Sequence, residues 1–385
     1  MQAPLSVDPE VDAALRRALE SARRLLLDAP FGSAISAILL GGSAALGEAV
    51  GWRERGDLPL GLILSDLDLA VVTRHPVDSA ERELVEARLL RAESDEPWPV
   101  ETRVGWYEEA QLSHQAGTPG VVDLAHRGRV LFGPPGFARR FQAPTPARIP
   151  REEAWRLLGN RALELRECRL APDVDGSGST RDQTPTPTQW HALAKACTGL
   201  WTAWLIRRGR YVCGLRAQLD LLDEPSAREA PEPLLAAALA WRSFRLAPRR
   251  EHLPEVADST RAFVDGLRAL VSSASDSPWQ EAWRYLPRER IGLRDHWRRW
   301  RRALRAMPSD TRSGLVGAVW RQQWADPGSA AVLGTPDSRE RALAVMYWLT
   351  HSDMDASSTA AWSEAARALG PGITDGGGTC RSASR

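Results

Sequence analysis

Two aspartates, Asp66 and Asp68, stand one residue apart within an apolar run of the chain. In a strand every second side chain points to the same face, so the two carboxylates are expected to lie side by side. Neighbouring carboxylates repel each other unless a cation lies between them. Mg²⁺ takes oxygen ligands and is usually bound through one or two carboxylates together with the phosphates of a substrate. The pair therefore predicts a Mg²⁺ site that binds a nucleoside triphosphate.

A Gly-Gly-Ser turn precedes the two aspartates. Gly41 and Gly42 end the apolar run 35–40, and Ser43 opens a predicted short helix over 44–50. Glycine lets the backbone approach a ligand closely, and the N–H groups at the start of a helix bind phosphate oxygens. Gly41, Gly42 and Ser43 are therefore candidates for phosphate binding.

The order strand, Gly-Gly-Ser, helix and strand with Asp-x-Asp resembles the nucleotidyltransferase superfamily, which includes DNA polymerase β and the aminoglycoside nucleotidyltransferases. The resemblance is confined mainly to the first part of the chain and implies a nucleotidyltransferase domain with a small mixed sheet over residues 1–150. It also implies Mg²⁺ as cofactor and ATP, or another nucleoside triphosphate, as co-substrate. The distance from Ser43 to Asp66 is longer than the family's usual spacing. The excess lies in the polar stretch 53–59, which is either a lid over the site or a tolerated insertion.

Members of this superfamily use a third carboxylate from a neighbouring strand, as a metal ligand or as the base for the attacking hydroxyl. The alternating segment 100–106 predicts a half-buried strand with Glu101 and Arg103 on one face. This segment resembles the strand that supplies the base in aminoglycoside adenylyltransferases, so Glu101 is preferred as third ligand and base. Asp123 is the competing candidate. The segment 127–133 that follows it resembles the turn and last strand that close the domain.

After Pro150 the pattern changes to helices only, which predicts an α-helical bundle domain over residues 151–370. Together with the sheet domain before it, this makes the expected fold class α+β. The segment 171–187 is rich in Pro, Gly and Ser and is predicted to be a flexible loop, and the tail 371–385 is predicted to be disordered. Helices are predicted over 151–170, 188–208, 233–244, 256–271, 291–307, 311–323 and 338–350.

The predicted helix 188–208 carries Lys195, the only lysine among the 50 Lys and Arg residues. One of its faces is apolar, and its other face carries a polar stripe of His191, Lys195, Thr198 and Thr202. The strong preference for arginine is typical of a GC-rich genome, so a retained lysine suggests that a compact ammonium is needed here. In several superfamily members a basic residue on a helix after the sheet holds the β- and γ-phosphates, and by this resemblance Lys195 is a candidate triphosphate ligand. The alternative is a lone lysine on a solvated face.

Three functions follow from these patterns. A catalytic domain followed by a helical bundle resembles the enzymes that modify aminoglycosides, so a hydroxyl of a small molecule is the first expected acceptor.

The helix predicted from Ile291 carries an arginine-rich face beside tryptophans, which is typical of nucleic-acid binding. Transfer to RNA, such as a tRNA end, is therefore the alternative. The near-neutral net charge of +1 favours a solvated face there instead. A non-catalytic nucleotide-sensing or antitoxin-like regulator is the third, although both aspartates and the glycine turn are retained.

Composition adds few constraints. A chain of 385 residues exceeds what one core usually organises, which agrees with two domains. No apolar stretch is long enough to span a bilayer and no signal segment is evident, because Asp8 and Pro9 predict the start of a helix, so a cytoplasmic protein is expected. The four cysteines have neither metal-site nor disulfide spacing. Sixteen tryptophans predict a core built from large aromatic side chains.

Overall fold

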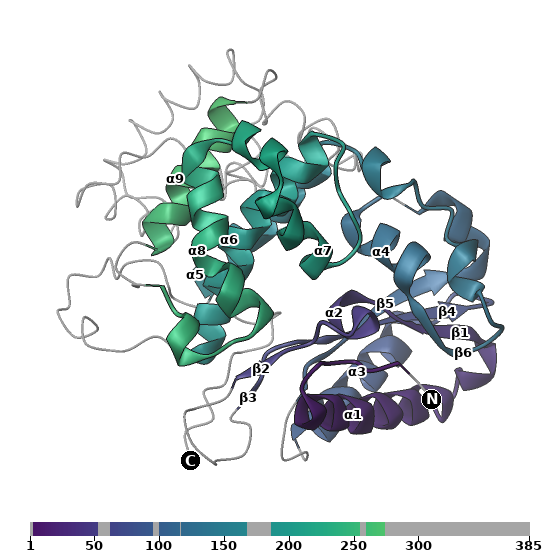
Figure 1. Cartoon of the computed structure of the whole chain (residues 1–385). Helices are drawn as coiled ribbons and strands as arrows, with labels where there is room; N and C mark the ends of the chain where they lie inside the picture. Colours follow the sequence, from purple (N-terminus) through teal and green to yellow (C-terminus); the bar gives the residue numbers. More distant parts are fainter. Residues whose placement is uncertain are drawn as a thin grey trace, which may run out of the picture.

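The computed structural model combines a small mixed sheet with a helical region, so the chain has an α+β fold (Figure 1). The structure describes residues 3–52, 62–94, 100–115, 117–167, 186–254 and 259–273. Several predictions fall outside these ranges: the insertion at 53–59, most of the loop 171–187, the helices expected after residue 290 and the tail 371–385. Thr186 and Pro187 are described and belong to the start of a helix rather than to that loop.

Helix α1 (Pro9–Leu27) shows how local sequence sets an element boundary. The Asp8 side chain accepts hydrogen bonds from the N–H groups of Glu10 and Val11, and Pro9 occupies the first helical position. Both features are typical of a helix start, so the predicted boundary is confirmed. One stripe of the helix, which includes Val11 and Leu15, is buried against the sheet.

The sheet contains four strands in the order β5-β4-β1-β6. Strand β1 (Ile35–Leu40) is antiparallel to both β4 (Leu67–Thr73) and β6 (Arg129–Phe132), whereas β4 and β5 (Thr102–Glu108) are parallel. The predicted strands at 35–40, 100–106 and 127–133 are therefore confirmed, within two residues at each end. A separate two-stranded ribbon pairs β2 (Gly51–Trp52) with β3 (Leu62–Ile63).

Helices cover both faces of the sheet. Ile38 and Leu40 pack with α1 and α3 (Ser79–Ser94), whereas Ala37 and Leu39 pack with α4 (Pro119–Arg127). Figure 1 shows the same three layers. A strand that is buried on both faces reads as a continuous apolar run rather than an alternation, which explains the sequence of β1.

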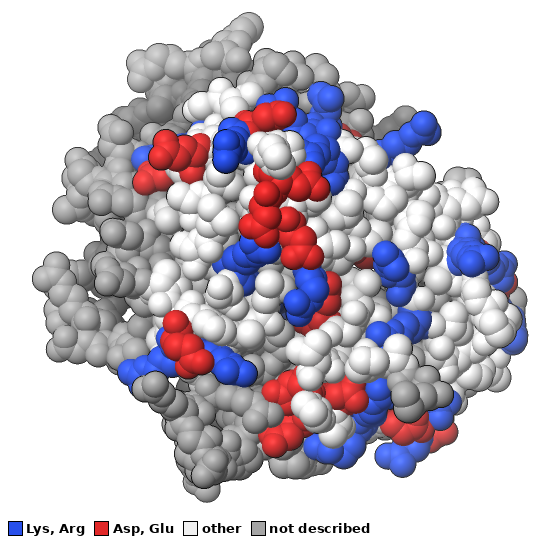
Figure 2. Space-filling view, in the orientation of Figure 1, with Lys and Arg blue, Asp and Glu red and all other residues white. Residues whose placement is uncertain are grey.

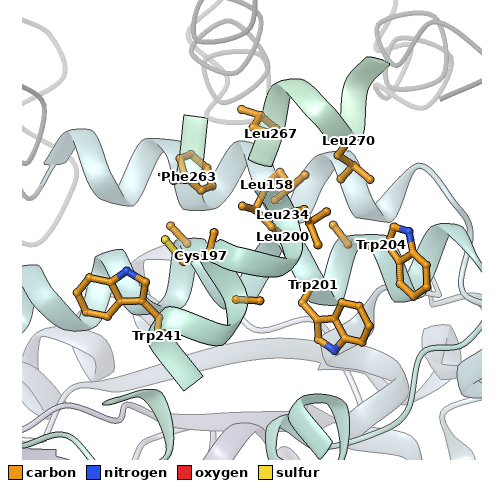
Figure 3. Close-up of a cluster of buried hydrophobic side chains, with 14 of the residues drawn as sticks. Leu158, Cys197, Leu200, Trp201, Trp204, Leu234, Trp241, Phe263, Leu267 and Leu270 are labelled. Atoms are coloured by element: carbon orange, nitrogen blue, oxygen red, sulfur yellow. The ribbon is translucent and has the colours of Figure 1, made fainter. Parts of the chain in front are cut away.

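The helical region is built around α6 (Pro187–Arg207). From Trp190 to Ile206 every residue of this helix is buried except Lys195 and Thr202, which are half-buried. Figure 3 shows its apolar side chains packed with those of the neighbouring helices, and Trp155, Trp201 and Trp241 are fully buried, as the tryptophan content predicts. The helices around α6 are α5 (Glu153–Glu167), α7 (Leu215–Asp220), α8 (Glu232–Leu246) and α9 (Ser259–Ser272).

Three contacts join the helical region to the sheet region. The Tyr211 hydroxyl donates to Asp123 Oδ2 at 2.9 Å. The carboxylate of Glu48 accepts from the backbone N–H groups of Leu215 and Arg216, at 2.8 and 3.1 Å, and so caps α7. The Trp52 ring contacts the rings of Trp190 and Phe244 in the helical region, with centroids 5.3 and 5.9 Å apart. These contacts hold the helical region against the end of the sheet that carries the candidate site.

Short 3₁₀ helices complete the connections, at Gly32–Ala34, Glu109–His114, Phe137–Arg140, Pro146–Arg148, Leu221–Asp223, Pro225–Glu229 and Arg250–His252. Among the described helices, none has both the length and the apolar character needed to cross a membrane.

Candidate active site

The Gly41–Gly42 turn lies against the strand that carries the aspartates. The N–H of Gly41 donates to the backbone oxygen of Asp68 at 2.7 Å, which holds the turn beside β4. Gly42 has a φ of +61°, and a Cβ atom added to it would lie 2.1 Å from Asp68 Oδ2. Only glycine satisfies both the left-handed backbone and the space that the carboxylate occupies.

The helix after this turn is shorter than predicted. Instead of running over 44–50, helix α2 covers Gly42–Leu46 and ends at Gly47, whose φ of +75° terminates it. Ser43 is its second residue and is half-buried. A five-residue helix aligns few peptide dipoles, so any phosphate binding here depends on the glycine turn itself rather than on a helix dipole.

Asp66 and Asp68 lie on the same face of the sheet, because Asp68 is the second residue of β4 and Asp66 directly precedes the strand. Burial and the neighbouring Asp66 carboxylate raise the pKa of Asp68 to about 6. Burial also raises the pKa of Asp66, but the positive charges of Lys195 and Arg103 outweigh it, so that the pKa of Asp66 falls below its ordinary value.

This arrangement fits a divalent cation. Two half-buried carboxylates that repel each other are stabilised when a cation is shared between them, and both present oxygen ligands. Within the described part of the chain, no group of three or more His, Cys, Asp or Glu side chains is placed to hold a metal ion. The described protein ligands for such an ion are therefore the two aspartates.

Glu101 lies beside the pair but is separated from it by Arg103. The N–H of Arg103 at Nε donates to Glu101 Oε1 at 2.9 Å, and the same atom lies 3.2 Å from Asp66 Oδ2. The Glu101 side chain is 64% exposed. The backbone of Glu101 is positioned by the parallel pairing of β4 and β5, since the N–H of Leu67 donates to the Glu101 backbone oxygen at 2.8 Å. The role of Glu101 as base or third ligand stays a prediction.

Asp123, the competing third carboxylate, is on helix α4 rather than on a strand. Burial raises its pKa to about 6, and the Tyr211 hydroxyl donates to it from the helical region. The nearby carboxylate of Glu48 contributes to this rise, and the bond from Tyr211 opposes it. The structure therefore places Asp123 in the contact between the two regions, where a structural role accounts for it.

Lys195 comes to the aspartates from α6. Among the charges near Asp66, that of Lys195 lowers the pKa of the carboxylate most. Burial lowers the pKa of Lys195 itself, and Asp66 opposes that effect. The sequence predicted that Lys195 belongs to one site with residues more than a hundred positions earlier, and the structure places its charge near Asp66. The predicted site residues of the turn, the strand and the helix are Gly41, Gly42, Ser43, Asp66, Asp68 and Lys195.

Four residues near the site were not predicted as part of it. Arg103 joins Glu101 to Asp66, and Arg161 on α5 and Arg245 on α8 act on the same groups as Lys195. His191 was noticed only as a member of the polar stripe on α6. It is buried, and burial together with Arg245, Lys195 and Arg161 lowers its pKa well below the ordinary value. Nothing in the sequence distinguishes these arginines from the many others.

No protein-family model matches this chain, and no curated protein matches its sequence. The functional interpretation therefore rests on the chemistry of the site. The arginine-rich helix predicted from Ile291 lies outside the described residues. Figure 2 shows basic and acidic side chains interspersed over the described part of one face, without a continuous basic area that would favour nucleic-acid binding there.

Proposed function

We propose that this protein is a Mg²⁺-dependent nucleotidyltransferase, which transfers a nucleoside monophosphate, AMP from ATP, to a hydroxyl of a small-molecule acceptor. The observation that carries this proposal is the half-buried pair Asp66 and Asp68, which lies against Gly42 and is faced by Lys195. The resemblance of the first 150 residues to the nucleotidyltransferase superfamily supports the same reaction. By that resemblance residues 1–150 are the catalytic domain, residues 151–370 the helical domain, and the acceptor is aminoglycoside-like.

Asp66 and Asp68 are the residues that would hold Mg²⁺, which when bound neutralises charge on the phosphates as the α-phosphoryl group is transferred. Gly42 leaves the Asp68 carboxylate room to lie against the turn. Gly41, Gly42 and Ser43 border the position of the phosphates, and Lys195 supplies a positive charge for the leaving pyrophosphate. Positioning and charge neutralisation provide most of the rate in such transfers.

Glu101 accepts the proton of the acceptor hydroxyl as its oxygen attacks the α-phosphorus in this proposal. The exposure of its carboxylate allows an acceptor to reach it from solvent. The Arg103 Nε donates to the carboxylate of Glu101 and lies 3.2 Å from Asp66 Oδ2, so it links the proposed base to a proposed metal ligand. A carboxylate within reach of the acceptor hydroxyl is suited to assist it as a general base.

The test is calorimetric titration of the protein with each of the four nucleoside triphosphates, with and without Mg²⁺. One triphosphate is expected to bind in the presence of Mg²⁺, and binding is expected to be lost when Mg²⁺ is removed or in the variant Asp68→Asn. The matched control is Asp220→Asn, which removes an exposed carboxylate at the end of α7. The control is expected to bind like the wild type.

Tight Mg²⁺-dependent binding that Asp68→Asn leaves unchanged would contradict the proposed site. Absence of binding by all four triphosphates would contradict the function and favour the antitoxin-like regulator instead. If binding is found, incubation of the labelled triphosphate with candidate acceptors and measurement of pyrophosphate release identify the acceptor. Release that requires RNA rather than a small molecule would favour transfer to RNA.

A further inference from the structure

Three cations from three different helices converge beside the aspartates. They are Arg161 on α5, Lys195 on α6 and Arg245 on α8. Helix packing brings the three side chains together, because α6 packs against both α5 and α8. The Trp52 ring on β2 contacts Trp190 on α6 and Phe244 on α8. These two aromatic residues directly precede His191 and Arg245 in the chain. The start of α6 and the end of α8 therefore meet at the tip of β2, close to the site.

The electrostatic neighbours of each group agree with this placement. Arg161, Lys195 and Arg245 all act on His191, and Arg161 and Lys195 both act on Asp66. His191 remains neutral because burial and these three charges disfavour its protonation. The cluster therefore carries three positive charges. Arg161 forms an ion pair with Glu164, and Asp66 and Glu164 are the acidic neighbours of Lys195.

The Arg245 Nε is buried without a hydrogen-bond partner. The carboxylates of Asp66, Glu164 and Glu48 act on the charge of Arg245, but none of them accepts a hydrogen bond from this N–H group. Both ring nitrogens of the buried His191 likewise have no partner. Buried N–H groups without an acceptor destabilise a folded protein. An anion rich in acceptor oxygens supplies what these groups lack.

We propose that Arg245 and Arg161 join Lys195 in binding the β- and γ-phosphates, and that Arg245 determines the preference of the site for a triphosphate over a monophosphate. The inference rests on the proposed function. A planar guanidinium donates two parallel hydrogen bonds to a phosphate, which an ammonium cannot do. The position of Arg245 on a different helix from Lys195 makes the bound phosphates a bridge between α8 and α6.

The experiment compares the affinities of ATP, AMP and inorganic tripolyphosphate by calorimetry, with Mg²⁺ present, in the full chain. In Arg245→Gln the affinities for ATP and tripolyphosphate are expected to fall by about tenfold to a hundredfold, the usual cost of losing a hydrogen bond between charged groups, and the affinity for AMP is expected to stay unchanged. In Arg245→Lys a smaller loss is expected, because the charge is kept and the planar geometry is lost.

The matched control is Arg242→Gln. Arg242 lies on the same helix, three residues away, and forms exposed ion pairs with Asp220 and Asp223. The control is expected to keep the ATP-to-AMP affinity ratio of the wild type. Thermal unfolding of both variants serves as the check on folding. Since the buried Nε of Arg245 has no hydrogen-bond partner, replacement by Gln is expected to leave the melting temperature unchanged or raised.

An ATP-to-AMP affinity ratio in folded Arg245→Gln equal to that of the wild type overturns the inference. The proposed function fails in a different way. If tripolyphosphate binds and its binding depends on Arg245, but no nucleotide binds, phosphate binding by the three cations is supported and the nucleotidyltransferase proposal is contradicted. If ATP binds and depends on Asp68 but not on Arg245, the function stands and the role of Arg245 does not.

Discussion

At the scale of single residues, the site depends on one close approach, that of the Asp68 carboxylate to Gly42. The space for a side chain at Gly42 is filled by Asp68 Oδ2, and the backbone there is left-handed. The missing side chain at Gly42 is what lets this carboxylate lie beside Asp66. The repulsion between the two aspartates is relieved by a bound cation or by protonation of Asp68.

Replacement of Gly42 by Ala tests this approach. The added Cβ would collide with Asp68 Oδ2, and the left-handed backbone would be strained, so we expect a loss of roughly 1–3 kcal/mol in the free energy of unfolding. Urea unfolding measures it. The control is Gly120→Ala, because a Cβ at Gly120 meets nothing within 4 Å and its backbone is helical. Equal stability of the two variants would contradict the geometry.

The variant Asp68→Asn is expected to be more stable than the wild type at pH 8 without metal. The pKa of Asp68 is raised to about 6 from an ordinary 3.8, so the folded state resists its ionisation, and an amide removes that penalty of about 1–3 kcal/mol. Addition of Mg²⁺ is expected to raise the melting temperature of the wild type and not that of the variant. A variant less stable than the metal-free wild type would contradict the pairing of the two carboxylates.

At the scale of elements, α6 organises the helical region and presents Lys195 to the site. It begins with a capping box, in which the side chains of Thr186 and Gln189 each bond to the other's backbone N–H. Its apolar residues fill the core on several sides, so its position is fixed by packing rather than by propensity. Lys195 is therefore held by a rigid element.

Packing around α6 is tested by Leu200→Ala. The Leu200 side chain is fully buried among α5, α8 and α9, and its loss would leave a cavity that costs about 2–5 kcal/mol in the free energy of unfolding. The control is Leu239→Ala on α8, because Leu239 is 45% exposed and its truncation is expected to cost less than about 0.5 kcal/mol. Urea unfolding of both variants measures these losses. A small loss in the free energy of unfolding for Leu200→Ala would contradict the close packing around α6.

Elements with strong local signals could be predicted from the sequence. Asp8 followed by Pro9 marks the start of α1, and the apolar run 35–40 between turn residues marks β1, because caps and burial act within a few residues of the chain. The end of α2 at Gly47 was missed, although a glycine is the usual residue there. Arg161 and Arg245 could not be predicted, since their meeting depends on how three helices pack.

At the scale of the whole molecule, the contact between the two regions contains a buried carboxyl. Asp123 on α4 accepts a hydrogen bond from Tyr211. Burial and Glu48 raise its pKa to about 6, against the opposing hydrogen bonds from Cys213 and Tyr211. The folded state therefore favours the protonated carboxyl, and Asp123 contributes most to stability where it is neutral.

The sign of the resulting pH dependence is determined by this shift. The stability that protonated Asp123 contributes is fully present below pH 3.8 and is lost as pH rises through about 6, by at most about 3 kcal/mol for a difference of 2.2 pKa units (6 − 3.8). Asp123→Asn keeps an acceptor for Tyr211 and cannot ionise. Its stability relative to the wild type is expected to increase between pH 4.5 and 7.5 in urea unfolding, and a constant difference would contradict the shifted pKa.

The cap that Glu48 provides for α7 has a consequence for how the protein can diversify. Glu48 binds backbone N–H groups that lie 167 and 168 positions further along the chain, so this cap does not depend on the side chains of α7. The exposed positions Arg216, Ala217 and Asp220 could therefore change without loss of the cap, whereas Gln218 and Leu219 are buried in the helical region. A helix capped through its main chain is a place where a protein can acquire new surface chemistry beside an unchanged site.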